Sequence, residues 1–263
     1  MKSIFGFLPL MILVLFYSCE SFQEDEVICL PVNMTATVVQ GTETKKIIAD
    51  FHYIPETDRL DHITWSNHQT HYFEYDDSER ILIMRQMRVD IKLQEERWFI
   101  YDGARIERIN LVERNLDRTY LEPLDSIYVG YISFEYEGGN IIEEKRYELS
   151  ENGKKLELVW KVNYEYDASG NILSSSASDP GATSKENVTM TYDSSKHPFS
   201  DLQYYFDGES YVNNLLSKVI DEEGFDYSYD LRCNEYGYPE TIYEKLGLIN
   251  SRIIRYSYVC PSP

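Results

Sequence analysis

The chain has 263 residues, a formal net charge of −20 and 23 tyrosines. This length allows one large all-β domain or two small ones. So acidic a surface repels phosphate backbones and anionic lipid headgroups, and we expect no nucleic-acid partner. Tyrosine packs its ring and leaves its hydroxyl in water, which suits a sheet whose faces are only half dry.

Residues 1–18 predict an export signal. Lys2 provides the positive start, and residues 4–17 form an apolar core too short to span a bilayer as a mature helix. A small residue and then Cys19 follow, which resembles the lipobox of bacterial lipoproteins, although the bulky Phe16 and Tyr17 depart from its usual pattern. The resemblance implies that Cys19 becomes the first mature residue and carries the lipid. The alternative is an ordinary secretory signal in which Cys19 has no role.

Residues 19–33 are predicted to form an acidic tether, and residues 34–263 the folded domain. The tether contains SFQEDE at 21–26, which resembles the acidic export tags of surface-exposed lipoproteins in Bacteroides-type bacteria. The resemblance implies an outer-membrane lipoprotein. It faces the cell exterior if the tag works and the periplasm if it does not.

Residues 160–173, WKVNYEYDASGNIL, predict a β-hairpin. Trp160, Val162, Tyr164 and Tyr166 alternate with polar residues, which places the apolar side chains on one face of a strand. Asp, Ser, Gly and Asn at 167–171 favour a turn, because Gly and Asn tolerate positive φ and Asp and Ser bond to neighbouring backbone N–H groups. An apolar run then begins the second strand.

The same unit recurs along the chain at intervals of 22 to 37 residues, and a tyrosine marks each copy. The marking residues are Tyr53, Tyr75, Tyr101, Tyr136, Tyr166, Tyr192, Tyr229 and Tyr258. If each marks a hairpin, the chain has up to about sixteen strands. We therefore predict an all-β fold, a single antiparallel β-meander of many hairpins curled into an open or closed barrel-like sheet.

Several turns end in Arg or Asn followed by Ile or Leu. The pairs are Arg59-Leu60, Arg80-Ile81, Arg105-Ile106, Asn140-Ile141 and Asn171-Ile172. The pattern Tyr-Asp-x-x-Gly-Asn/Arg-Ile/Leu resembles the YD repeats of Rhs-type proteins. With the lipobox and YDSSKHPF at 192–199, residues 45–260 resemble an uncharacterised family of Bacteroides-type lipoproteins with a porin-like, meandering β-fold. The resemblance implies the fold and brings no known activity.

Two stretches lack the hairpin pattern. Residues 107–124 have charges spaced for a short helix, or they form an irregular excursion between two strands. Residues 173–187 contain four serines and Asp179-Pro180-Gly181, which predicts a loop or mobile flap.

No metal site or cofactor is predicted. His68 and His71 lie close in sequence, but in a strand they point to opposite faces; His62 is a further neighbour only if it lies across a hairpin. Acidic turns such as 76–77 and 167–171 carry oxygen ligands of the kind that calcium uses. None has EF-hand spacing, and turn chemistry explains them.

The sequence predicts no enzyme. Adjacent acids such as Glu95-Glu96, Glu143-Glu144 and Glu222-Glu223 face opposite ways in a strand, and no nucleophile elbow, HExxH helix or phosphate loop occurs. The alternative is a glycoside hydrolase-like enzyme with two carboxylates on the concave face of the sheet.

Three cysteines besides Cys19 leave the disulfide pairing open. Cys29 reaches Cys260 if the meander curls so that its ends approach, while Cys233 with Cys260 is the local pairing. The third possibility is three reduced cysteines buried among the strands.

Aromatic residues are the candidate ligand-binding groups, because their rings stack on sugars. The candidates are Trp65, Trp98, Trp160, Tyr164 and Tyr166. The simpler interpretation is that they pack within the sheet. We predict a non-enzymatic binding or structural module for a glycan or another envelope protein. Charge on both faces of its strands implies that it meets the membrane through the lipid anchor only.

Overall fold

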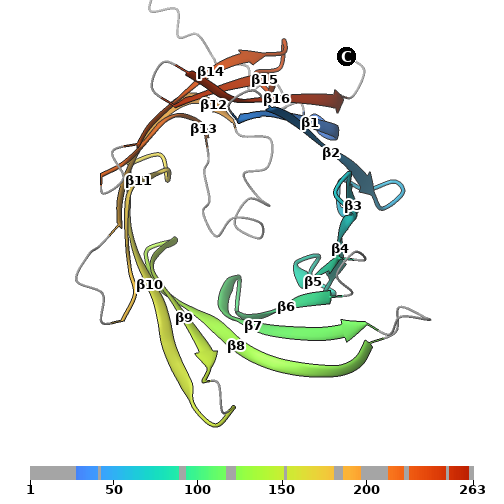
Figure 1. Cartoon of the computed structure of the whole chain (residues 1–263), viewed down its shortest axis with the longest axis vertical. Helices are drawn as coiled ribbons and strands as arrows, with labels where there is room; N and C mark the ends of the chain where they lie inside the picture. Colours follow the sequence, from blue (N-terminus) through green and yellow to red (C-terminus); the bar gives the residue numbers. More distant parts are fainter. Residues whose placement is uncertain are drawn as a thin grey trace, which may run out of the picture.

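The computed structural model describes residues 28–40, 43–88, 93–116, 123–150, 153–180, 186–196, 213–221, 225–246 and 249–260. These residues form sixteen antiparallel strands, each paired with its neighbours in sequence, and β1 pairs with β16 to close a barrel (Figure 1). The predicted all-β meander is confirmed, and it is closed. This part of the chain contains no helix with the length and apolar character needed to cross a bilayer.

The strands follow one another around the barrel in chain order. They are β1 (Leu30–Gln40), β2 (Glu43–Tyr53), β3 (Leu60–Trp65), β4 (Gln69–Tyr75), β5 (Ile81–Arg88), β6 (Leu93–Asp102), β7 (Arg105–Leu116), β8 (Pro123–Glu137), β9 (Asn140–Leu149), β10 (Leu156–Tyr166), β11 (Ile172–Ser178), β12 (Glu186–Lys196), β13 (Asn213–Ile220), β14 (Phe225–Cys233), β15 (Pro239–Leu246) and β16 (Ile249–Val259).

The first and last strands meet at a seam that a disulfide closes. β1 pairs with β16 from Leu30 opposite Val259 onward, and Cys29 bonds to Cys260 beside the first pair. The sequence left the disulfide pairing open, and the structure contains the Cys29–Cys260 bond. Cys233 is an exposed free thiol. Strand structure begins at Leu30 rather than at residue 34. Cys19 lies outside the described residues.

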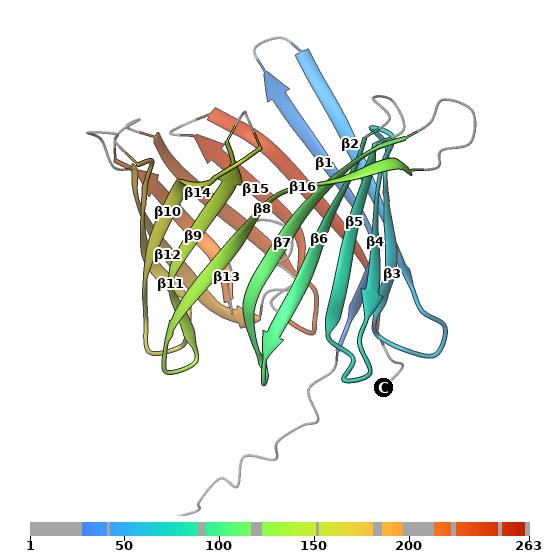
Figure 2. The same cartoon turned by 90° about the horizontal axis from the view of Figure 1, so that it is seen from below.

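Every marked hairpin turn among the described residues lies at the barrel end where β1 begins and β16 ends, which points down in Figure 2. We call it the turn end. Its described turns cover residues 54–59, 76–80, 103–104, 138–139, 167–171 and 234–238. One chemistry recurs there: the Oδ1 atom of Asp167 accepts the backbone N–H groups of Ser169 and Asn171, and Asp76 does the same for Ser78 and Arg80.

Seven of the eight marking tyrosines, all except Tyr229, form a belt around the turn end. The hydroxyl of Tyr75 donates to the backbone oxygen of Leu60 at 2.8 Å, and that of Tyr101 donates to Ile81 at 2.7 Å. The hydroxyls of Tyr53, Tyr136, Tyr166, Tyr192 and Tyr258 donate to Pro31, Ile106, Ile141, Ile172 and Pro239 in the same way. Each tyrosine thus ties the end of one strand to the start of the strand before it.

Arginines reinforce the first half of this tyrosine belt. The guanidinium of Arg80 lies 4.1 Å from the ring centroid of Tyr101, and Arg105 lies 5.3 Å from that of Tyr136. Arg80 also donates to the backbone oxygen of Gly103 in the next turn. The arginine at the end of one turn therefore contacts the tyrosine ring that precedes the next turn and the backbone of that turn. These contacts give a structural reason for the Arg-Ile and Arg-Leu pairs.

The two faces of the wall differ in burial. On β2, Ala49 and Phe51 are buried while Asp50 and His52 between them are exposed. Across the barrel the apolar positions include Ile63, which is 1% exposed, and Ile109, which is 2% exposed. Side chains converge on the concave side of a closed wall and spread apart on its convex side. The apolar face therefore lines the interior, and the charged face is the outer wall.

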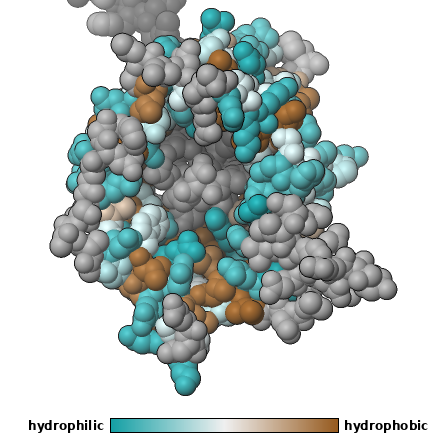
Figure 3. Space-filling view, viewed as in Figure 1, coloured by the Kyte–Doolittle hydropathy of each residue, from teal (hydrophilic) through white to brown (hydrophobic). Residues whose placement is uncertain are grey.

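Two hydrophobic clusters occupy the inner face. The larger extends from Ala49 on β2 to Leu111 on β7, and the smaller from Val162 on β10 to Met190 on β12. Figure 3 shows hydrophilic residues over most of the coloured outline of the barrel end, with hydrophobic residues gathered in the lower wall. Several large hydrophobic side chains are exposed nonetheless, among them Tyr72, Leu82 and Trp98.

Three sequence predictions need correction. The loop predicted for residues 173–187 is wrong for its first part, because β11 continues to Ser178. Ser174 and Ala177 pair with both β10 and β12. This pairing overrides the weak strand preference of serine. The short helix in 107–124 is wrong, since β7 extends through Leu116. The turn assigned after Tyr229 comes later, because β14 continues to Cys233 and the turn covers residues 234–238.

Candidate interaction surface on the outer wall

A buried carboxylate lies at the centre of a polar cluster on the outer wall. Glu96 of β6 is 2% exposed, although it points away from the barrel interior. Its Oε1 atom accepts hydrogen bonds from Arg85 at 2.9 Å and from Gln94 at 2.5 Å. Its Oε2 atom accepts from Trp98 at 2.8 Å and from Arg114 at 2.9 Å. Both oxygens are therefore satisfied by donors from three adjacent strands.

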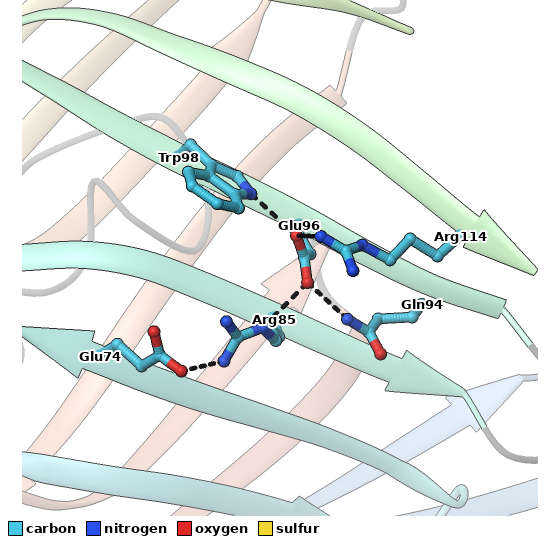
Figure 4. Close-up of polar contacts among 6 residues, drawn as sticks. All are labelled: Glu74, Arg85, Gln94, Glu96, Trp98 and Arg114. Carbon is cyan, nitrogen blue, oxygen red and sulfur yellow. Dashed lines mark hydrogen bonds and ion pairs between the residues drawn. The ribbon is translucent and has the colours of Figure 1, made fainter. Parts of the chain in front are cut away.

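The cluster follows directly from strand register. Gln94, Glu96 and Trp98 alternate along β6 and so share one face, while Arg85 on β5 is the direct cross-strand partner of Glu96. Arg85 donates in turn to Glu74 on β4. Figure 4 shows these side chains on β4 to β7, with strands of the opposite barrel wall behind them.

The electrostatics keep Glu96 ionised. Burial raises the pKa of its carboxyl, but hydrogen bonds from Trp98 and Arg85 and the positive charges of Arg114 and Arg85 outweigh burial and hold the pKa below its usual value. A carboxylate with a lowered pKa and four donors is a poor proton donor. Its chemical role is to hold the surrounding donors in place.

Trp98 is the most exposed of the residues that bond to Glu96. Its side chain is 39% exposed, and its indole N–H is occupied by Glu96. Within the described part of the chain, no other aromatic ring packs on it. The indole therefore offers an apolar face at a fixed orientation. Arg85 lies on the neighbouring strand, and its partner Glu74 lies one strand further, with Ile83 directly between Glu74 and Trp98.

Other rings on the same wall stack on one another. The ring centroids of His52 and His62 are 4.2 Å apart, and His62 lies 5.6 Å from Tyr72 on β4. Tyr131 on β8 stacks on Tyr147 on β9 at 4.7 Å. Stacked rings cover each other's faces and turn their edges outward. The Trp98 ring, by contrast, leaves a face open to solvent.

The other candidate aromatic residues lie on the inner face. Trp65 donates through its indole N–H to Nδ1 of His71 at 2.8 Å. Trp160 packs against the smaller hydrophobic cluster, Tyr164 is buried in that cluster and Tyr166 belongs to the tyrosine belt. Trp160, Tyr164 and Tyr166 thus share one face of β10. Trp65 lies on β3, and Trp98 lies on the opposite face of the wall.

The pair Glu143-Glu144 divides between the two faces as expected, whereas Glu222 and Glu223 lie outside the described residues. Glu144 is buried on the inner face and receives a hydrogen bond from the Tyr164 hydroxyl at 3.2 Å, whereas Glu143 points outward to Lys145 and Lys161. Glu244 is the other buried inner carboxylate, on β15, and five strands separate it from β9 along the wall.

Metal-ligating side chains are sparse in the described residues, where no three or more His, Cys, Asp or Glu gather closely enough to hold an ion. His71 is buried, and burial lowers its pKa to about 4, which keeps it neutral. His68, by contrast, lies in the β3–β4 turn at a φ of 66°. The sequence pair His68 and His71 is therefore not a site.

The sequence analysis missed the Glu96 cluster because its members come from four strands. One signal was present: Gln94, Glu96 and Trp98 occur at alternate positions, so they share a face. Which residues of β5 and β7 would lie opposite them depends on register, and a strand register cannot be read from one strand's sequence.

Comparisons with known proteins show likeness of fold alone. No protein-family model matches the chain, and no curated protein matches its sequence. A crystal structure of a porin-like protein from Bacteroides vulgatus is similar to this chain with a TM-score of 0.51 and 12% identity, over 88% of this chain and 99% of that chain. A porin-like protein from Bacteroides uniformis gives a TM-score of 0.35 at 10% identity, over 86% and 95% of the chains.

Proposed function

We propose that the chain is a cell-envelope lipoprotein whose barrel stands in water and binds a ligand without catalysis. The anchor would be a lipid on Cys19, as the export signal and the cysteine after it indicate. Metabolic labelling with an alkyne fatty acid tests this. The wild-type protein should carry the label and fractionate with the outer membrane, and Cys19→Ala should lose the label. Label retained by Cys19→Ala would contradict the proposal.

The character of the outer wall supports a barrel outside the bilayer. A barrel embedded in lipid needs an outward apolar band about 25 Å tall. Here the outward positions of neighbouring strands carry charged side chains at mid-wall, such as Glu74, Arg85, Lys145 and Lys161. Placing such groups in hydrocarbon costs several kcal/mol each. The lipid would then be the only attachment of the protein to the membrane.

The ligand we propose is a glycan, and the observation that carries this is the exposed, hydrogen-bonded indole of Trp98. A sugar presents C–H groups that pack on an aromatic face and hydroxyls that pair with carboxylate and guanidinium groups. Trp98, Arg85 and Glu74 provide these partners on three neighbouring strands. Because Glu96 fixes the indole and the guanidinium, little side-chain freedom would be lost on binding.

A glycan array probed with the soluble residues 20–263 tests this function. Leu82 gives a matched control, since its side chain is also 39% exposed but it brings no aromatic face. Wild type and Leu82→Ala should bind the same glycans, and Trp98→Ala should lose them. An empty array for the wild type, or binding retained by Trp98→Ala, would contradict a glycan site here.

A further inference from the structure

The closest pair of imidazole rings in the described chain belongs to two outward histidines of neighbouring strands. His52 on β2 is the direct cross-strand partner of His62 on β3. Their ring centroids lie 4.2 Å apart with an interplanar angle of 12°. His52 is exposed and 27% of the His62 side chain is exposed, so both rings are accessible from solvent.

We propose that His52 and His62 form a two-histidine site for a divalent transition-metal ion of the Zn²⁺, Ni²⁺ and Cu²⁺ class. Neutral imidazole nitrogen is a preferred ligand of these ions, whereas Ca²⁺ and Mg²⁺ select oxygen. Two protein ligands leave coordination positions for water or for a group from a second molecule. The site is separate from Trp98 and does not depend on a glycan.

Hydrogen bonds around the pair suit this role. The Nδ1 atom of His62 lies 2.7 Å from a carboxylate oxygen of Asp61, so Nδ1–H donates and the lone pair stays on Nε2. A carboxylate that accepts the second ring N–H is the usual partner of a metal-bound histidine. The Nε2 atom of His52 has only a long contact, 3.4 Å to the hydroxyl of Thr64, which a metal ion readily replaces.

Closing the site requires the two imidazole rings to rotate. Two nitrogens on a tetrahedral zinc ion lie about 3.3 Å apart, given Zn–N bonds of about 2.0 Å. The ring centroids are 4.2 Å apart, and the direct pairing of His52 with His62 on β2 and β3 holds both side chains on one face within reach of a shared ion. The rings must turn from parallel so that both planes contain the metal, and the final torsion of an exposed histidine is soft.

The charge of the protein favours a cation at this place. The chain has a formal net charge of −20, and Asp50 and Asp61 lie on the strands that carry the two histidines. Asp50 accepts a hydrogen bond from Asn33. It therefore contributes negative electrostatic potential to the site rather than a bond to the metal.

Zinc titration of the purified full chain by calorimetry tests the site, with a Cys233→Ser background to remove the exposed thiol. We expect one site whose affinity falls about tenfold or more in His52→Ala and in His62→Ala. Asp61→Asn should lower it about tenfold, as loss of an outer partner does. His68→Asn is the control, because it removes an exposed imidazole at a φ that Asn tolerates.

Cu²⁺ provides a second readout independent of affinity. Electron paramagnetic resonance of the bound ion should show coupling to two nitrogens in the wild type and to one in either alanine variant. Cooperative thermal unfolding without metal should be retained in all variants, with a small loss of stability in His52→Ala and His62→Ala because these changes remove ring stacking. Wild-type affinity retained by His52→Ala or His62→Ala, loss in His68→Asn, or no binding by the wild type would overturn the proposal.

Discussion

Asp193 and Asn214 are joined by two hydrogen bonds although 21 positions separate them in the chain. The backbone N–H of Asn214 donates to Oδ1 of Asp193 at 3.1 Å, and its side-chain amide donates to Oδ2 at 3.2 Å. Asn171 makes the same two bonds to Asp167 only four positions away. The chain at Asp193 therefore closes like an ordinary turn of this barrel, with a long segment inserted within it.

Replacing residues 194–213 by Ala-Ser-Gly should leave the barrel folded. The shortened chain would reproduce the turn of residues 167–171, with Asp193 and Asn214 at its two ends. We expect a β-sheet circular dichroism spectrum and cooperative thermal unfolding close to wild type. An Asp193→Ala change in the shortened chain should lower stability by about 1–2 kcal/mol, because it removes both bonds. Failure of the shortened chain to fold would show that the insertion is structural.

Removing one hydroxyl of the tyrosine belt should weaken the barrel. Tyr101→Phe leaves the backbone oxygen of Ile81 without its hydroxyl donor, which costs about 1–2 kcal/mol of unfolding free energy. Tyr72→Phe is the control, since that ring is 38% exposed on the outer wall, and its change should stay within about 0.5 kcal/mol. Chemical denaturation measures both. Equal effects would mean that the belt bonds contribute nothing beyond a surface hydroxyl.

Glu79 occupies a turn position that favours glycine. Its φ is 64°, and the corresponding residues of two other turns are Gly170 and Gly237. Its ion pair with Arg59 spans 3.4 Å at an exposed site and is worth little. We expect Glu79→Gly to raise stability by about 0.5 kcal/mol or more and Gly170→Glu to lower it by about 1 kcal/mol. Glu79→Ala, which keeps a Cβ atom, should show no gain in the same denaturation experiment.

Loss of the Glu96 charge should destabilise the fold in a pH-dependent way. The native state holds the pKa of Glu96 below the value of about 4.3 expected in an unfolded chain. Its contribution is therefore fully present above that value and is lost as the pH falls through the native pKa. Glu96→Gln should cost about 2–3 kcal/mol at pH 7, because it leaves the charge of Arg114 without its carboxylate partner and Arg85 with Glu74 alone. The difference from wild type should shrink below pH 4.

Glu135→Gln is the matched control for this pH series. Glu135 also pairs with a cation, Lys145, but its side chain is 62% exposed. Its loss should change stability by less than about 1 kcal/mol at every pH. A constant difference between Glu96→Gln and wild type from pH 7 to pH 3 would contradict the role given to the Glu96 carboxylate.

The local sequence pattern was enough to predict the hairpins, but not which side chains of neighbouring strands lie next to each other in the barrel wall. The alternating residues around Tyr164 and the turn residues at 167–171 lie close together in the sequence. They are enough to predict the hairpin, and the hairpin is present. The serines of β11 were misassigned because strand pairing, not their own preference, makes them a strand. The Glu96 cluster and the His52–His62 pair depend on register between strands, which one sequence without coordinates leaves open.

The bond between Cys29 and Cys260 also determines how the molecule responds to mechanical load. A force applied between the two chain ends passes directly from one sulfur to the other and bypasses the chain between two cysteines whose sequence separation is 231. The strand ladders inside that covalent ring carry none of this tension. Only after reduction would the same pull peel β1 from β16 and unzip the wall strand by strand.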